Sequence, residues 1–149
     1  MARRRDLVAV VSERGAFVAD TAPLVYRLER SGTPDVLDVV DALFDEVESG
    51  GLGCLVSTLV AAEFLMRPYR MNPRAAPGVD AYLRGPHVGL VPPGLGVAHG
   101  AARLVAKRVV PRLSDAIVAA TAAEVDLPLV TGDRRLARAV GGLLVQDYA

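Results

Sequence analysis

Four acidic side chains lie inside or beside apolar runs, where a charged group is unfavourable. They are Asp20 after residues 17–19, Glu63 within residues 59–65, Asp115 before residues 116–120, and Asp133 after residues 129–132. An ionised carboxylate is buried only where a cation or hydrogen-bond donors compensate its charge. If the fold gathers the four, their mutual repulsion raises their pKa values, and a divalent cation removes that repulsion. The pattern therefore predicts a metal-dependent hydrolase, and most simply a nuclease.

Length and composition are typical of a single globular domain. The chain has 149 residues, of which 52% are apolar and 23% are charged, and a domain of this size buries about 68–70% of the surface of its unfolded chain. No apolar run approaches the ~20 residues that span a bilayer, and the single cysteine, Cys54, can form no internal disulfide. We expect a cytoplasmic protein without membrane contact. Residues 1–15 are expected to be an N-terminal extension or an edge strand, and residues 16–149 the domain.

The arginines are the candidates for contacts with a nucleic-acid backbone. Positive and negative residues number 17 each, so the formal net charge is zero and no global field attracts nucleic acid. Arginine nevertheless suits bidentate phosphate contacts, and Arg134 and Arg135 directly follow Asp133. We therefore take Arg134, Arg135 and Arg112 as candidate RNA contacts. The alternative, that the basic clusters are only solvated helix faces, stays open.

Short apolar strands alternate with helical patterns, which favours α/β architecture with a mainly parallel sheet. Thr33 is placed to cap an amphipathic helix over residues 35–48, with Pro34 at its first position. Ser57 or Thr58 is expected to cap a helix to about residue 65, and Ser114 a helix to about residue 125. Residues 68–77 are expected to be loop. The predicted strands are residues 16–19, 53–57, 88–91, 129–131 and 143–146, and further helices are expected over residues 24–28, 97–108 and after Asp133.

The acids can meet at one edge of this predicted sheet. Asp20 and Asp133 each follow a predicted strand, and in open α/β sheets the ligand crevice lies beyond the carboxyl ends of the strands. Asp115 is in the first turn of one predicted helix, and Glu63 lies one to two turns into another. Each acid also has a structural interpretation: Asp133 as a helix cap, Asp115 as a helix-dipole partner, Asp20 as a turn residue, and Glu63 as a surface residue.

Four segments in this order resemble the motifs of PIN-domain ribonucleases, especially the VapC-type toxins of prokaryotic toxin–antitoxin pairs. They are residues 18–26, 56–64, 113–122 and 129–136, each carrying one of the acids. The resemblance implies a three-layer α/β/α fold with a central, mainly parallel sheet. The chain departs from the family pattern at Ala22 and Pro23, which replace a small polar residue, and at Gly132, where many relatives have asparagine. Neither departure removes a carboxylate.

The same resemblance implies the chemistry of the site. The metal would be Mg²⁺ or Mn²⁺, because such hard cations prefer oxygen ligands. A water activated by the metal would attack an RNA phosphodiester in line and leave a 5′-phosphate and a 3′-hydroxyl. The implied roles are direct or water-mediated ligands for Asp20, Glu63 and Asp115, a ligand or water-orienting group for Asp133, and supporting hydroxyls for Thr21 and Thr131.

The implied partner is an antitoxin protein, and the chain is expected to form a homodimer or a hetero-oligomer with the antitoxin. A nuclease with no evident specificity device would harm its own cell unless it were silenced. An amphipathic antitoxin helix could lie between the apolar helix at residues 24–28 and the acid-rich outer face of residues 35–48, as in helix-in-groove recognition. The alternative is that these residues only pack the domain's own core.

Three other functions are compatible with parts of the pattern. A haloacid-dehalogenase-like phosphatase needs a second acid where this chain has Ala22, and a downstream lysine for which Lys107 is the only candidate. A catalytically silent PIN-fold module would bind RNA or protein, and a metal titration combined with an RNA-cleavage assay separates it from an enzyme. A purely structural α/β domain would bind neither Mg²⁺ nor Mn²⁺ in calorimetry.

Overall fold

The computed structural model describes residues 6–149, and this part of the chain contains one parallel sheet. Its order is β3-β2-β1-β4-β5, with every neighbouring pair parallel. The order reverses between β1 and β4, so the carboxyl ends of these two strands form the topological switch point at which such sheets bind ligands. The strands are β1 (Ala16–Ala19), β2 (Gly53–Ser57), β3 (Gly89–Val91), β4 (Leu129–Thr131) and β5 (Leu143–Leu144).

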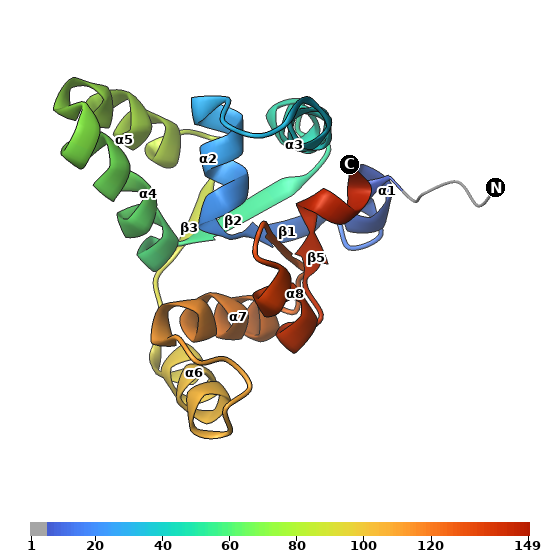
Figure 1. The fold of residues 1–149 in the computed structure, drawn as a ribbon, viewed down its shortest axis with the longest axis vertical. Coiled ribbons are helices and arrows are strands. Elements are labelled where there is room, and N and C mark those ends of the chain that lie inside the picture. The colour runs from blue at the N-terminus through green and yellow to red at the C-terminus, as the bar shows by residue number, and fades with distance from the viewer. Residues whose placement is uncertain (1–5) are drawn as a thin grey trace.

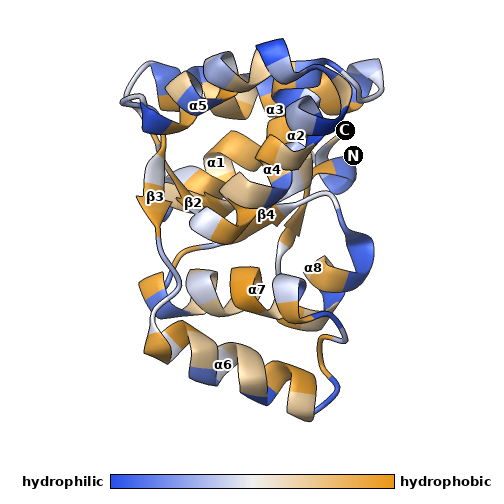
Figure 2. Ribbon diagram, turned by 90° about the vertical axis from the view of Figure 1, so that its left-hand side faces the viewer, coloured by the Kyte–Doolittle hydropathy of each residue, from blue (hydrophilic) through white to orange (hydrophobic). Residues whose placement is uncertain are grey.

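Helices cover both faces of the sheet and produce three layers (Figure 1, Figure 2). One face carries α2 (Thr21–Glu29), α3 (Pro34–Glu48), α4 (Thr58–Met71) and α5 (Ala76–Arg84). The other face carries α7 (Leu113–Val125) and α8 (Arg134–Val140), and α6 (Leu95–Ala106) lies outside α7. The α/β/α architecture predicted from the sequence is confirmed.

The amphipathic pattern of α3 produces the contact that anchors β1. The helix is capped as predicted, because the Thr33 hydroxyl accepts the N–H of Val36 at 3.4 Å. Phe44 meets Phe17 of β1 edge to face, with ring centroids 6.0 Å apart, an arrangement worth about 0.5–1.5 kcal/mol beyond its buried area. This contact fixes the strand that leads to Asp20. The buried face of α3 consists of Val36, Val40, Leu43, Phe44 and Val47.

Helix α7 is apolar on nearly all sides because it packs between the sheet and α6. Such a helix needs no polar stripe over its buried length, and its buried residues include both Ala116 and Thr121. A Cβ added at Gly100 of α6 would lie 3.2 Å from the Cβ of Ala120, so the two helices approach closely. No helix in residues 6–149 is long and apolar enough to cross a membrane.

Residues 7–12 form a helix, α1 (Leu7–Ser12), where the sequence suggested an extension or an edge strand. Asp6 caps this helix by accepting the N–H of Val8 at 3.1 Å. Leu7 and Val11 lie one turn apart and are buried in the core, where α1 packs against α3 and β1. The helix was missed because its 6 residues make less than two turns, too few to show a helical period. The predicted boundary at residue 16 stays a prediction, and residues 1–5 lie outside the described residues.

Other boundaries also differ from the sequence prediction, most clearly those of α4, α7 and β5. Helix α4 continues through Pro68 into the predicted loop, because Pro68 lacks only its own N–H and its carbonyl still accepts the N–H of Asn72 at 2.8 Å. In α7, Arg112 occupies the N-cap position with extended backbone angles, so Ser114 lies inside the helix and does not cap it. Strand β5 is shorter than predicted, because the chain turns into the 3-10 helix Val145–Tyr148.

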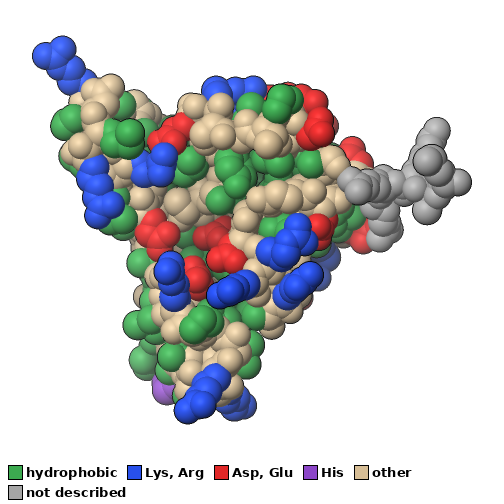
Figure 3. Space-filling view, in the orientation of Figure 1, with side chains coloured by type: hydrophobic (Ala, Val, Ile, Leu, Met, Phe, Trp, Pro, Cys, Tyr) green, Lys and Arg blue, Asp and Glu red, His purple; other side chains and the backbone are tan. Residues whose placement is uncertain are grey.

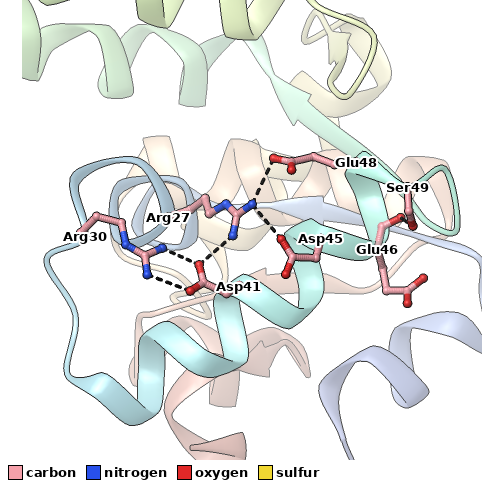
Figure 4. Close-up of polar contacts among 7 residues, drawn as sticks. All are labelled: Arg27, Arg30, Asp41, Asp45, Glu46, Glu48 and Ser49. Atoms are coloured by element: carbon pink, nitrogen blue, oxygen red, sulfur yellow. Dashed lines mark hydrogen bonds and ion pairs between the residues drawn. The ribbon is translucent and has the colours of Figure 1, made fainter.

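The acidic face of α3 is paired with α2 (Figure 4). The Arg27 guanidinium binds three carboxylates of α3, those of Asp41 at 2.7 Å, Asp45 at 3.0 Å and Glu48 at 3.2 Å. Hydrogen bonds from Arg30, and then from Arg27, lower the pKa of Asp41 to about 2. These ion pairs engage three acids of the outer face of α3, and the helix-in-groove contact expected between α2 and α3 stays a prediction. The helical pattern of α3 showed the acidic face but not which neighbour covers it.

Candidate active site

Asp20 lies at the switch point of the sheet and is buried, with 8% of its surface exposed. It directly follows β1, and its backbone N–H donates to the carbonyl of Val130 in β4 at 2.9 Å. Its Oδ1 accepts the N–H of Thr21 at 2.8 Å, and its Oδ2 accepts the hydroxyl of Thr131 at 2.7 Å. Burial raises the pKa of Asp20, the two hydrogen bonds oppose that rise, and the charge of Asp133 adds to it. The carboxylate is thus oriented by two donors.

Asp133 follows β4 and is oriented by the same hydroxyl. Thr131 is fully buried, and its Oγ1 accepts the N–H of Asp133 at 3.0 Å. The Oδ1 of Asp133 accepts the N–H of Leu136 at 3.1 Å, so Asp133 also caps α8. None of residues 6–149 donates a hydrogen bond to its Oδ2. Asp133 therefore caps α8, as its structural interpretation predicted, and its Oδ2 remains available to a metal ion or a water.

Glu63 is joined to this pair of acids through Thr21. Glu63 is half-buried on α4, and its Oε2 accepts the hydroxyl of Thr21 at 2.9 Å. Thr21 is the residue whose backbone N–H also binds Asp20. One threonine from the first turn of α2 therefore contacts two carboxylates, that of Asp20 at the end of β1 and that of Glu63 on α4.

Asp115 completes the group from the opposite layer. It lies in the first turn of α7 and is half-buried. Burial raises the pKa of Asp115, and the charges of Asp20, Asp133 and Glu63 raise it further, whereas Arg112 lowers it. Asp115 therefore lies within electrostatic reach of the other three predicted acids. Figure 3 shows acidic side chains gathered in a hollow in the middle of this face, between the upper helices and α7, with Lys and Arg side chains along its border.

The donor set fits a hard divalent cation in its chemistry. It consists of carboxylate and hydroxyl oxygens, the ligands that Mg²⁺ and Mn²⁺ prefer. Within residues 6–149, no arginine, lysine or histidine forms an ion pair with any of the four acids. In this described range, no three of the acids lie close enough together to hold one metal ion as they stand. Asp115 nevertheless lies within electrostatic reach of the other three.

The three candidate arginines differ in their surroundings. Arg112 and Arg135 line a cavity of about 440 Å³ together with Asp115 and Asp133. Arg134 does not line it, and its guanidinium pairs with Asp147 at 3.3 Å. Of the three candidates, Arg112 at the N-cap of α7 and Arg135 on α8 therefore share a cavity with Asp115 and Asp133.

Sequence reasoning missed a polar contact that supports the turn before Asp133. The amide of Gln146, in the C-terminal 3-10 helix, donates to the carbonyl of Gly132 at 3.2 Å and to the hydroxyl of Tyr26 at 3.3 Å. A Cβ at Gly132 would lie 2.8 Å from the Cβ of Ala22, so only glycine fits against α2 here. The departures noted at Ala22 and Gly132 are therefore in contact with each other. No local pattern joins residues so far apart in the chain.

The chain belongs to the PIN domain family, which matches residues 17–142. Three solved structures share the fold. A toxin–antitoxin complex from Klebsiella pneumoniae is 19% identical with a TM-score of 0.61, and the match covers 86% of this chain and 95% of that chain. FitAcB from Neisseria gonorrhoeae is 18% identical with a TM-score of 0.65, over 86% and 95% of the two chains. VapBC2 from Rickettsia felis, bound to a DNA fragment from their promoter, is 14% identical with a TM-score of 0.64, over 87% and 96%.

No curated protein sequence matches this chain. At the identities of the three solved structures, the likeness establishes the fold alone. Family membership removes the haloacid-dehalogenase-like phosphatase from the alternatives, because that enzyme belongs to a different family.

Proposed function

We propose that this protein is a metal-dependent endoribonuclease of the VapC type, the toxin of a toxin–antitoxin pair. The observation that carries the proposal is the grouping of Asp20, Glu63, Asp115 and Asp133 at the switch point of the sheet, where burial and mutual repulsion raise the pKa values of Asp20 and Asp115. Such acids are typical of functional sites. Membership of the PIN family and structural neighbours that include toxin–antitoxin complexes support the proposal.

The residues of this chain would hold and orient the reacting groups. Asp20 would bind Mg²⁺ or Mn²⁺ through lone pairs that Thr21 and Thr131 leave unused, with Glu63 and Asp115 approaching from α4 and α7. The bound cation would supply Lewis-acid charge and an attacking water of lowered pKa. In this scheme the Oδ2 of Asp133 would accept a hydrogen bond from the attacking water and orient it toward the phosphodiester.

RNA cleavage with a charge-neutral variant tests the proposal. Purified protein should cleave single-stranded RNA only when Mg²⁺ or Mn²⁺ is present. Glu63→Gln should reduce the rate by about 10²-fold or more, because it removes a charged ligand of the cation that stabilises the reacting phosphate. Glu124→Gln, an exposed glutamate on α7, is the matched control and should cleave normally. Cleavage that continues in EDTA, or in a folded Glu63→Gln variant, contradicts the proposal.

An antitoxin would be the protein partner. Since the acids on the outer face of α3 are engaged by Arg27, we place the docking surface on α2 and α4, which the Arg67–Glu29 ion pair joins at 2.7 Å. This region exposes apolar side chains that a monomer in water leaves uncovered: Leu28, Met66, Tyr69 and Met71. Co-expression with the neighbouring small open reading frame is the test. Met66→Glu should abolish co-purification. If this variant still retains the partner, the interface does not include this part of α4.

One observation favours the alternative that the protein is a catalytically silent PIN-fold module. Within residues 6–149, no three acids lie close enough together to hold one metal ion as they stand. This arrangement is also compatible with a catalytically silent module that binds RNA or protein. Titration of Mn²⁺ separates the two functions. The enzyme binds the ion and cleaves, whereas the silent module does not cleave RNA at any Mn²⁺ concentration.

A further inference from the structure

A cavity opens directly beside the acids. It has a volume of about 440 Å³, within the range of about 300–1,000 Å³ that is usual for ligand pockets. Asp115 and Asp133 form one side of it, and Arg112 and Arg135 contribute the only basic side chains among its lining residues. A molecule in this cavity therefore contacts two of the proposed metal-binding acids.

The two arginines are available for a ligand. Neither Arg112 nor Arg135 forms an ion pair within residues 6–149, and both are exposed. They differ from Arg27, which is engaged with three carboxylates, and from Arg134, which is paired with Asp147. Free guanidinium groups beside an acidic site suit a ligand that carries a phosphate, because Arg binds phosphate in a bidentate manner.

The remaining wall of the cavity is apolar. Val110 and Leu136 are buried in this wall, and Pro111 forms part of the same loop between α6 and α7. The backbone of Arg108 is left-handed, with φ of 58°, and the N–H groups of Val109 and Val110 both bond back to the carbonyl of Leu104 at 3.0 and 3.3 Å. This hydrogen-bonded turn fixes the apolar wall against α8.

We propose that this cavity is the subsite for one unpaired nucleotide of the RNA, next to the phosphodiester that the acids attack, and the assignment rests on the ribonuclease function proposed above. Arg112 and Arg135 bind backbone phosphate, and the exposed apolar surface at Val109 and Pro111 contacts the base or sugar. The base must be unpaired, because bases in an RNA duplex are hidden inside the helix. The protein therefore selects single-stranded RNA.

Charge favours RNA over a protein segment as the occupant. A basic peptide would meet Asp115 and Asp133 favourably, but it would also meet the unpaired guanidinium groups of Arg112 and Arg135. An acidic peptide would encounter the reverse problem. A nucleotide suits this lining better, because its phosphate pairs with the arginines, its uncharged base needs only the apolar wall, and a cation held by the acids would compensate Asp115 and Asp133.

Binding of a fluorescent oligoribonucleotide tests the subsite without any cleavage. The measurements use the Asp20→Asn protein in EDTA, so that RNA is not consumed. Arg112→Gln and Arg135→Gln should each weaken binding about tenfold, since hydrogen bonds to charged groups carry that much free energy. Each should also reduce the salt slope of log Kd by about 0.7, the value for one phosphate contact of a single strand. Arg138→Gln removes the same charge from the exposed surface of α8 outside the cavity and should leave both quantities unchanged.

A second variant tests the shape of the cavity. Ala139 lines it and is exposed on α8, so Ala139→Leu fills space without changing charge. In otherwise wild-type protein with Mn²⁺, this variant should lower the ratio of RNA cleavage to bis(p-nitrophenyl) phosphate hydrolysis about tenfold, because the small diester does not need the nucleotide subsite. Annealing the oligoribonucleotide to its complement should abolish binding.

Three outcomes overturn the subsite: equal binding of single-stranded and duplex RNA, an unchanged salt slope in both arginine variants, or arginine variants that lose only a co-purifying protein. The last of these assigns the cavity to a protein partner. Failure of the ribonuclease function is distinct from these outcomes. In that case wild-type protein hydrolyses neither RNA nor the small diester with Mn²⁺, while the arginine variants still decide whether RNA occupies the cavity.

Discussion

The hydroxyl of Thr131 joins Asp20 to Asp133. It donates to the Oδ2 of Asp20 at 2.7 Å and accepts the backbone N–H of Asp133 at 3.0 Å. Thr131 is fully buried at the end of β4, so its side chain has no competing water. One hydroxyl therefore orients the acids that follow two adjacent strands, β1 and β4.

Replacement of Thr131 by valine keeps the shape and removes this link. We expect Thr131→Val to lower the free energy of unfolding by about 1–3 kcal/mol, because it leaves buried polar groups without a partner. Loss of the support behind a ligand should also weaken Mn²⁺ binding by about 10–100-fold. Thr121→Val is the matched control, because the Thr121 hydroxyl is equally buried but bonds only to the carbonyl of Ile117 within α7. Calorimetric Mn²⁺ titration that gives equal affinities for the two variants rejects this role, and Thr131→Ser should restore most of the loss.

Gly132 should not accept the asparagine that many PIN-family relatives carry. An added Cβ would lie 2.8 Å from the Cβ of Ala22 and 3.2 Å from the hydroxyl of Tyr26. Gly132→Ala should destabilise the fold by about 1–3 kcal/mol through overpacking. The double variant with Ala22→Gly should recover part of this loss, so that a double-mutant cycle by urea unfolding gives a favourable coupling free energy. If the effects of the two substitutions on the free energy of unfolding are additive, the contact with Ala22 is not the cause of the destabilisation.

Arg27 should be the main electrostatic support of the α2–α3 contact. Its side chain is 17% exposed and binds three carboxylates. Arg27→Met should lower the free energy of unfolding by about 2 kcal/mol, because hydrogen bonds to charged groups are lost and the acids repel one another. Arg30→Met, at an exposed site that shares only Asp41, should have a much smaller effect. Equal Tm values for wild type and Arg27→Met would show that the ion pairs add nothing.

Much of the site could be predicted from the sequence because its acids interrupt apolar runs. A carboxylate after a buried strand, such as Asp20 or Asp133, has few structural explanations, and parallel strands end at a common edge. The order of the elements and the cap at Thr33 followed from local patterns for the same reason. The resemblance of residues 129–136 to a family motif also pointed to Thr131.

The rest depends on contacts between residues far apart in the chain. The acidic face of α3 was visible in the sequence, but its pairing with Arg27 required knowledge of which helix lies beside it. The contact of Gln146 with Gly132 spans the C-terminal turn and β4. The sequence likewise placed Arg134 and Arg135 together, whereas only Arg135 lines the cavity, because adjacent residues on a helix point about 100° apart.

The stability of the metal-free protein should fall as the pH rises through the raised pKa values of Asp20 and Asp115. Burial lifts both pKa values above the ordinary 3.8, so the folded protein binds more protons than the unfolded chain in this window. Their contribution is complete below pH 3.8 and is lost as the pH rises through the folded-state pKa values. Asp41 acts in the opposite direction, because its pKa is lowered to about 2 and its contribution is lost in acid.

Urea unfolding in EDTA between about pH 4 and pH 7 measures this dependence. Asp115→Asn should flatten the decline, and added Mn²⁺ should reverse it near neutral pH by mass action. If wild type and Asp115→Asn have identical pH profiles without metal, the pKa of Asp115 is not raised in the folded protein.

The central claim is that the four carboxylates form one metal site, and titration of Mn²⁺ into wild-type and Asp20→Asn protein tests it most directly. Asp80→Asn is the control, because Asp80 is an exposed aspartate of α5 that pairs only with Arg84. We predict that wild type and Asp80→Asn bind Mn²⁺ and gain thermal stability from it. Asp20→Asn should keep the fold, lose both responses and lose RNA cleavage. A folded Asp20→Asn protein that binds Mn²⁺ with wild-type affinity and cleaves RNA at the wild-type rate would contradict the account.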